Sequence, residues 1–409
     1  MSRLFNAFLP LLYITSFIYR RRVIRNTRIV AVVGSYGKTS TMRALCSILC
    51  GGINRYAANG SLFWATHAIL RTRPGTPYLV IEAAIMGPGQ MKKFARLINP
   101  DITVVTSVGH EHRTSFKTLE NTRNEKADMV RALASSGLAV LNSDDPHVLW
   151  MKTQTKARVV LCGSGKSDDV RLEHMRLDWP PKSRLRISIG DRIFDLETRL
   201  VGRPMAYPVL AAIAVALEEG LDMEKTVLEL GKLTPTIGRL EPIKLEGGAY
   251  LLRDDFKGSV ETVETALETL LHIPADRKTI ILGEASESPE KDGKLYRRIG
   301  AYAASAADRV IFVGGKNRFR LLRSGAEKAG KRRGDLFHVR GDLLKAVEAL
   351  PDSLGENDLV LVKGRGSQRM DRISLKIMGR DVRCTIKECN AKLTRCHHCG
   401  MLTREWKHE

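Results

Sequence analysis

The 409-residue chain lacks several features that mark other classes of protein. It has no internal repeat and no long low-complexity segment, which argues against a repeat architecture and a long flexible linker. Aromatic residues make up only 6% of the chain and are sparse beside its basic clusters, which argues against a stacking platform for single-stranded nucleic acid. The N-terminal apolar run, residues 4–19, is slightly short for a membrane-spanning helix. We expect no cleavable signal, because this run has no basic segment before it and no small-residue cleavage site after it.

Basic residues are in large excess, with 66 Lys and Arg against 45 Asp and Glu and a formal net charge of +21. They concentrate in residues 20–28, 316–333 and 363–383. Three partners fit this charge: an anionic membrane surface, a polyanionic substrate such as a carboxylate-rich peptide or polymer, and nucleic acid. We favour the first two over nucleic acid.

The remaining composition fits an α/β protein, which we expect to stay in the cytoplasm because the basic flank follows the N-terminal apolar run. Hydrophobic residues make up 43% of the chain, enough for two or three cores, and strand and helix patterns alternate along it. We expect two successive units with parallel sheets, over residues 28–237 and 238–380. Residues 184–200 predict an antiparallel hairpin with its turn at Gly190 and Asp191.

Residues 28–40, RIVAVVGSYGKTS, carry the most specific motif. An apolar strand, a glycine turn and a helix start place backbone N–H groups and a positive dipole end at one point, which predicts a phosphate site. Lys38 would reach the β/γ-phosphates, and the Thr39 hydroxyl would bind Mg²⁺. The further glycine of the general P-loop spacing is replaced by Val32, so a shorter Gly-x-x-Gly-Lys-Thr form remains. The nucleotide-binding residues predicted here are Gly34, Ser35, Gly37, Lys38, Thr39 and Ser40.

This shorter loop resembles that of the Mur ligase family, whose members join an amine to a carboxylate at the expense of ATP. Further segments agree with the family pattern in the same order, from about residue 28 to about residue 372. They include VIEAAIMGPGQM, ITVVTSVGHEH, NEKADMV, AVLNSDDP, IGRLEP, LLRDDFKGS, KTIILGEASES and NDLVLVKGRGSQRM. Within the family, the pattern is most similar to the enzymes that add D-alanyl-D-alanine to a muramoyl tripeptide.

The resemblance implies a P-loop-type central ATPase domain followed by a second, Rossmann-like α/β domain. It also implies an acyl-phosphate intermediate, with catalysis by positioning and by cations. Glu82 would bind Mg²⁺ with Thr39, while His112 and a carbamylated Lys126 would hold a second metal ion. Lys38, Lys126 and His112 are the expected catalytic residues, and His110 could replace His112.

Other residues follow from the same resemblance. Arg239 and Asp255 would bind ATP from the last domain, and Asn59 would face the substrate. The stretch 202–212 departs from the family, because Pro204 and Pro208 stand where a histidine and asparagines are usual.

The N-terminal segment, residues 1–27, is a second departure. The family's first domain holds a uridine-diphosphate sugar, and we expect this chain to lack it, because the strand before the glycine loop begins at residue 28. We expect instead an apolar helix with a basic flank, associated with the inner face of the membrane as an interfacial or short anchoring helix. The alternative is a helix packed against the protein's own core.

The tail, residues 381–409, contains a third departure, the spacing C-x₄-C-x₆-C-x₂-C. Cys384, Cys389, Cys396 and Cys399 fit a tetrahedral structural zinc site, and His397 or His398 could replace a cysteine. Disulfides are the competing interpretation, which a reducing cytoplasm disfavours.

Together these patterns predict an ATP- and Mg²⁺-dependent ligase that forms an amide bond in cell-envelope or polymer biosynthesis. Its carboxylate acceptor and amine donor are not identified by the sequence; a peptide, a lipid-linked precursor or a growing polymer fits the acceptor. The alternative is a non-ligating NTPase or a scaffold with a basic, zinc-containing binding surface.

Overall fold

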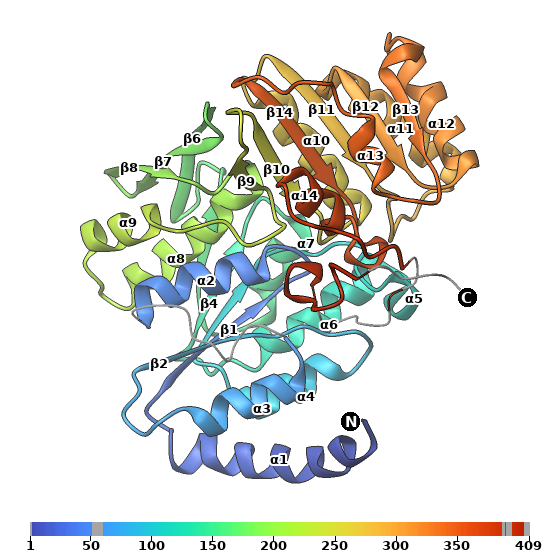
Figure 1. The fold of residues 1–409 in the computed structure, drawn as a ribbon. Helices are drawn as coiled ribbons and strands as arrows, with labels where there is room; N and C mark the ends of the chain where they lie inside the picture. The colour runs from blue at the N-terminus through green and yellow to red at the C-terminus, as the bar shows by residue number, and fades with distance from the viewer. Residues whose placement is uncertain (1, 51–59, 387–388, 390–394, 405–409) are drawn as a thin grey trace. The chain divides into compact units, whose positions relative to one another are not determined.

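The computed structural model describes residues 2–50, 60–386, 389 and 395–404. The chain divides into two compact units. Unit 1 comprises Met1–Arg176, Arg184–Thr198 and Arg203–Leu233, and unit 2 comprises Leu177–Ser183, Arg199–Gly202 and Thr234–Glu409. The two α/β units expected from strand and helix alternation are both present (Figure 1).

Unit 1 is built on an eight-stranded sheet with the order β2-β1-β3-β4-β5-β6-β7-β8. The strands from β2 to β6 pair in parallel. A two-residue connection at Gly190 and Asp191 joins β7 to β8, as the hairpin prediction required. The strand bounds are β1 Arg28–Val33, β2 Tyr78–Glu82, β3 Ile102–Val105, β4 Leu138–Asn142, β5 Arg158–Gly163, β6 Val170–Asp178, β7 Lys182–Ile189 and β8 Arg192–Thr198.

Helices cover both faces of this sheet, which explains why β1 is an unbroken apolar run. Ile29, Ala31 and Val33 pack toward α3 and α4, whereas α2, α8 and α9 pack together on the other face (Figure 1). The helix bounds are α1 Ser2–Arg22, α2 Lys38–Leu49, α3 Leu62–Arg71, α4 Gln90–Ile98, α5 Arg113–Phe116, α6 Leu119–Arg131, α7 Pro146–Leu149, α8 Ala206–Glu218 and α9 Met223–Gly231.

Unit 2 has a six-stranded sheet with the order β13-β12-β11-β14-β10-β9, parallel except for the edge strand β9. Helices α10, α11 and α12 cover one face, and α13 and α14 cover the other. The bounds are β9 Glu241–Lys244, β10 Tyr250–Asp254, α10 Val260–His272, β11 Arg277–Leu282, α11 Asp292–Ala306, β12 Arg309–Val313, α12 Lys316–Lys328, β13 Leu336–Val339, α13 Lys345–Glu348, β14 Asp358–Lys363 and α14 Asp371–Ile377.

Helix α1 contains the N-terminal apolar run and is docked on unit 1. Tyr13, Phe17 and Tyr19 pack against the core shared by β1, α3 and α4, and Figure 1 shows α1 along the outer side of these helices. Arg20 is 3% exposed and donates hydrogen bonds to the carbonyls of residues 24, 27, 98 and 99 and to the Asp101 carboxylate. The side of α1 that carries Tyr13 and Phe17 therefore packs against the protein's own core, as the alternative prediction states.

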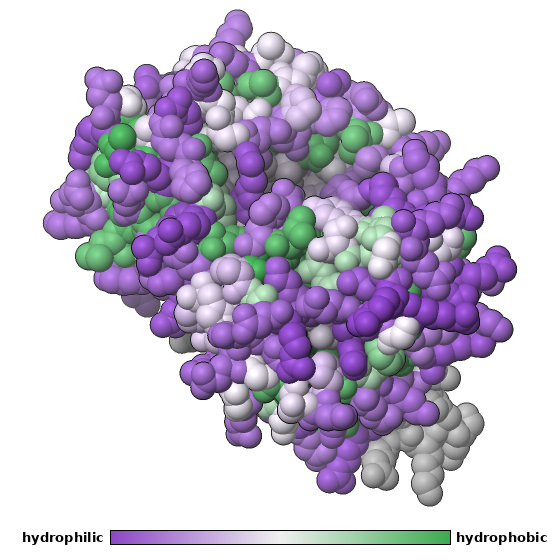
Figure 2. Space-filling view, turned by 90° about the horizontal axis from the view of Figure 1, so that it is seen from above, coloured by the Kyte–Doolittle hydropathy of each residue, from purple (hydrophilic) through white to green (hydrophobic). Residues whose placement is uncertain are grey.

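The opposite side of α1 remains apolar and exposed. Leu11, Ile14 and Ile18 are 61%, 55% and 53% exposed and follow helical spacing. Across the described residues, no helix is long and apolar enough to span a membrane. On the face drawn in Figure 2, hydrophilic residues predominate and apolar residues form separate patches between them.

Candidate active site

The glycine turn after β1 has the backbone that a phosphate-binding loop requires. Gly34 and Gly37 have φ of +149° and +81°, values that L side chains rarely adopt. A Cβ atom at Gly34 would overlap the Thr106 hydroxyl. Gly37 is the N-cap of α2, so the first helical turn, whose N–H groups make no hydrogen bond to a carbonyl within the helix, begins immediately after it. The turn therefore offers an anion site at a helix N-terminus.

Residues after β3 hold this turn in place. The Ser107 hydroxyl accepts a hydrogen bond from Tyr36 N at 2.9 Å, and the Ser35 hydroxyl accepts one from Gly109 N at 2.9 Å. The Thr106 hydroxyl donates to the carbonyl oxygens of Val33 and Tyr36. Parallel pairing of β1 with β3 brings the two loops to the same edge of the sheet.

Two predicted lysines meet at one carbonyl of the turn. Lys38 Nζ lies 2.7 Å from Gly34 O and 3.1 Å from Ser35 O. Lys126 Nζ, from α6, lies 3.0 Å from the same Gly34 O, and its residue is only 3% exposed. The Thr118 hydroxyl caps the N-terminus of α6 by accepting from Asn121 N, which sets where this helix begins. Lys126, which the family resemblance places at a second metal ion, is thus buried at the glycine turn.

The predicted magnesium ligands Thr39 and Glu82 are also brought together. The Thr39 hydroxyl donates to Glu82 Oε2 at 2.9 Å, and Glu82 ends β2, the strand paired with β1. A hydroxyl and a carboxylate fit Mg²⁺, which prefers oxygen ligands and retains several waters. The described part of the chain contains no group of three or more His, Cys, Asp or Glu side chains placed to hold a metal ion.

His112 connects to the turn through Glu111, a residue that sequence reasoning missed. Glu111 Oε1 lies 3.9 Å from His112 Nε2, and Glu111 Oε2 lies 3.6 Å from Lys38 Nζ. The Glu111 side chain is 11% exposed, so its charge is weakly screened. The only sequence signal was an acid between two histidines after a strand. His112 itself has φ of +56° and caps α5.

Arg239 and Asp255 lie at one corner of unit 2. A Cβ atom at Gly238 would approach Asp255 Oδ1 to 2.5 Å, so Arg239 follows a residue that abuts this carboxylate. Asp255 is 3% exposed and pairs with Arg253 Nε at 2.9 Å. The guanidinium carbon of Arg239 lies 5.0 Å from the centroid of the Phe256 ring.

Beside this corner, Lys363 and Asp254 form a buried pair, with Nζ 2.7 Å from Oδ2. Burial lowers the pKa of Lys363 and raises the pKa of Asp254, while the attraction between the two charges opposes both shifts.

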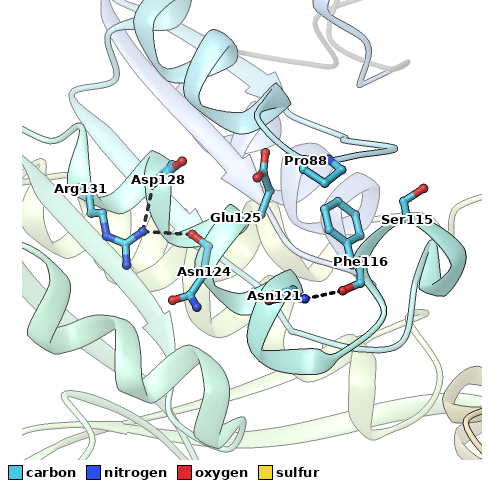
Figure 3. A pocket seen from close by; sticks show the side chains of 8 residues that line it. All are labelled: Pro88, Ser115, Phe116, Asn121, Asn124, Glu125, Asp128 and Arg131. Carbon is cyan, nitrogen blue, oxygen red and sulfur yellow. Dashed lines mark hydrogen bonds and ion pairs between the residues drawn. The ribbon is translucent and has the colours of Figure 1, made fainter.

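A cavity of about 460 Å³ lies beside α6 (Figure 3). Several polar groups in its wall bond to the protein itself: Glu125 accepts from the backbone N–H groups of Gly89 and Met91, and Arg131 bonds to Asp128. Lys126 is absent from the lining, so the cavity is separate from the glycine turn. The lining residues are Pro88, Ser115, Phe116, Asn121, Asn124, Glu125, Asp128 and Arg131.

Comparison with known proteins identifies the family to which this chain belongs. The sequence profile of the Mur ligase middle domain matches residues 32–216, and that of the Mur ligase, glutamate ligase domain matches residues 238–366. The chain belongs to the Mur ligase family. Its Mur ligase fold is supported by MurF from Acinetobacter baumannii, with a TM-score of 0.79 at 19% identity over 91% of this chain and 81% of that one. MurF from Thermotoga maritima, solved in complex with ADP, gives a TM-score of 0.76 at 20% identity over 91% of this chain and 83% of that one.

Similar relatives by sequence are named UDP-N-acetylmuramoyl-tripeptide--D-alanyl-D-alanine ligase. The one from Mycobacterium bovis is 28% identical over 74% of this chain and 61% of its own length. The one from Escherichia coli is 25% identical over 85% of this chain and 76% of its own length. This Mur ligase chain thus spans about three fifths of the length of the first relatives it matches.

Two remaining predictions for this Mur ligase concern Asn59 and the tail. Asn59 lies outside the described residues. None of the seven cysteines forms a disulfide. Cys384 and Cys396 are buried, whereas Cys389 and Cys399 are half-buried, and no metal-holding group forms among the tail residues that the structure describes.

Proposed function

We propose that this Mur ligase chain is an ATP-dependent enzyme that joins a carboxylate to an amine through an acyl phosphate. One observation carries the proposal: Lys38 and Lys126 both donate to Gly34 O, at the N-terminus of α2. The Lys38 ammonium and a helix N-terminus at one turn favour the phosphoryl groups of ATP, and the buried Lys126 amine beside them is the group that we propose to be carbamylated. Phosphoryl transfer depends mainly on such positioning and charge neutralisation.

Each residue of this arrangement has a proposed role. Lys38 and the N–H groups of α2 bind the β/γ-phosphates of ATP. Thr39 and Glu82 would hold Mg²⁺, which supplies positive charge to the phosphoryl oxygens. His112 and a carbamylated Lys126 remain our proposal for the second metal ion. From unit 2, Arg239 and Asp255 are proposed to bind the nucleotide.

The substrates are proposed by class. The relatives are named for a UDP-N-acetylmuramoyl tripeptide and D-alanyl-D-alanine. We propose for this chain a peptide-like carboxylate acceptor and an amino acid or peptide amine, in cell-envelope or polymer biosynthesis. The large positive charge suits an acceptor rich in carboxylates or phosphates.

Phosphate release from Mg²⁺-ATP tests the function directly. The purified protein is assayed with pools of acids and amines, including muramoyl peptides with D-alanyl-D-alanine. We expect release only when one acid and one amine are both present. Lys126→Ala should abolish it, and wild-type activity should fall in CO₂-free buffer and recover with bicarbonate.

Lys152→Ala is the matched control, because Lys152 is an exposed lysine of the same unit. It should keep wild-type activity. Phosphate release at the same rate with and without every pool of acids and amines, and at the same rate in Lys126→Ala as in the wild type, would instead support a non-ligating NTPase or a scaffold.

We also propose that α1 associates peripherally with an anionic membrane surface. Its exposed Leu11, Ile14 and Ile18 support this, together with the exposed basic residues Arg22 and Arg25 that follow them. The zinc site of the tail stays a proposal that rests on cysteine spacing alone.

A further inference from the structure

The Cys-rich tail is docked on α14 within unit 2. Val382, Cys396 and Leu402 form a small buried cluster with Leu375 of α14. The Cys396 N–H donates to Asp371 Oδ2 at 2.9 Å, and Arg372 Nη1 donates to Ile386 O at 2.8 Å. The Cys396 contact holds the residue that directly follows Arg395, and the Arg395 carbonyl accepts a hydrogen bond from His398 N.

Arg395 reaches the corner that holds Arg239. Its Nη1 donates to Ile237 O at 2.6 Å, two residues before Arg239. Its guanidinium carbon lies 4.4 Å from the centroid of the Phe256 ring, and that of Arg239 lies 5.0 Å from the same centroid. Two guanidinium groups, one from the tail and one from the 238–241 turn, therefore share one half-buried ring.

This arrangement concentrates positive charge without a matching carboxylate for Arg395. In the described part of unit 2, no carboxylate lies within ion-pair distance of Arg395, and Asp255 pairs with Arg253 instead. Burial is the main cause that lowers the pKa of Arg395, and the charge of Arg239 lowers it further, while the more distant carboxylates of Asp255 and Asp371 oppose this shift. Neighbouring like charges are unfavourable in a partly buried place, and a bound anion would relieve the repulsion.

We propose that Arg395 and Arg239 together form a phosphoryl-binding site beside Phe256. Guanidinium groups bind phosphate oxygens through two parallel N–H donors, and stacking on an aromatic ring orients their planes. The proposal rests on the ligase function above, which would supply the phosphoryl group. Two sources share this chemistry: the phosphates of the nucleotide and a phosphate carried by the acceptor.

Calorimetric titration with ADP and with inorganic pyrophosphate tests the site on the full chain. Arg395→Gln removes the charge but keeps an N–H donor for Ile237 O, and Arg395→Ala removes both. We expect each variant to lose about tenfold or more in affinity for at least one anion, the usual effect of removing a charge-assisted hydrogen bond. Arg383→Ala is the control, because Arg383 lies in the same tail with a 55% exposed side chain.

Steady-state kinetics separate the two sources. A KM that rises for ATP alone assigns the site to the nucleotide, and one that rises for the acid alone assigns it to the acceptor. Wild-type affinities and KM values in Arg395→Gln would overturn the proposal, even if Arg395→Ala is destabilised. If the wild type releases no phosphate with any pool, the ligase function fails, while the pyrophosphate titrations still decide the site.

Discussion

At the scale of single residues, Gly34 is a position where the backbone conformation and the close approach of Thr106 leave no room for a larger side chain. Gly34→Ala would place a methyl group on the Thr106 hydroxyl and force the two loops apart. We expect this variant to lose stability and at least about tenfold in ADP affinity, because the N–H groups of the turn would move. Gly75→Ala is the control: Gly75 also has positive φ, +84°, but open space around it. It should lose about 1 kcal/mol of stability and keep its affinity, as measured by thermal unfolding and calorimetry.

Sequence reasoning at this scale predicts roles for residues that a local pattern marks. The strand, glycine turn and helix of residues 28–40 predict that Lys38 and Thr39 bind phosphate and Mg²⁺, and the structure brings Glu82 to Thr39. Thr106 and Glu111 were missed, because their partners lie about seventy residues earlier in the chain. Arg395 was missed because its position depends on how the tail packs on α14. Such contacts follow from tertiary packing, which no local motif encodes.

At the scale of elements, α1 shows where an apolar pattern is ambiguous. Residues 4–19 are apolar on more than one side, so periodicity could not separate a membrane helix from a packed one. The structure assigns Tyr13 and Phe17 to the inner side, and Leu11, Ile14 and Ile18 to the outer side. The arginines of residues 20–22 look alike in the sequence, but Arg20 is buried and Arg22 is exposed in the structure.

The buried Arg20 predicts how strongly α1 is held. Arg20→Met removes five hydrogen bonds, four to carbonyl oxygens and one to the Asp101 carboxylate. We expect a loss of about 3 kcal/mol in the free energy of unfolding of unit 1, because four carbonyl oxygens lose a charged hydrogen-bond donor. Denaturant unfolding followed by tryptophan fluorescence measures it, with Arg22→Met as the exposed control. Equal midpoints for the two variants would show that α1 contributes little to the fold.

At the scale of the whole molecule, positive charge is strongly biased toward the N-terminal quarter. Residues 1–100 contain fourteen Lys or Arg and a single acid, Glu82, which is buried. Exposed basic residues occur on α1, α3 and α4, the three helices that pack together on one side of unit 1. Each basic residue near an anionic lipid surface contributes about 1 kcal/mol, and the outer side of α1 adds apolar area that can enter the interface.

Vesicle co-sedimentation tests this surface. The wild type should bind phosphatidylcholine vesicles only when they contain phosphatidylglycerol, and added salt should weaken binding because it screens exposed charges. Ile14→Glu with Ile18→Glu should abolish binding without loss of ATP turnover, because both side chains point away from the core. Leu228→Glu is the control, since Leu228 of α9 is 61% exposed, as Leu11 is. A wild type that stays in the supernatant with every vesicle would contradict membrane binding. If the wild type forms dimers and the double variant does not, the apolar side of α1 is a contact between protein molecules.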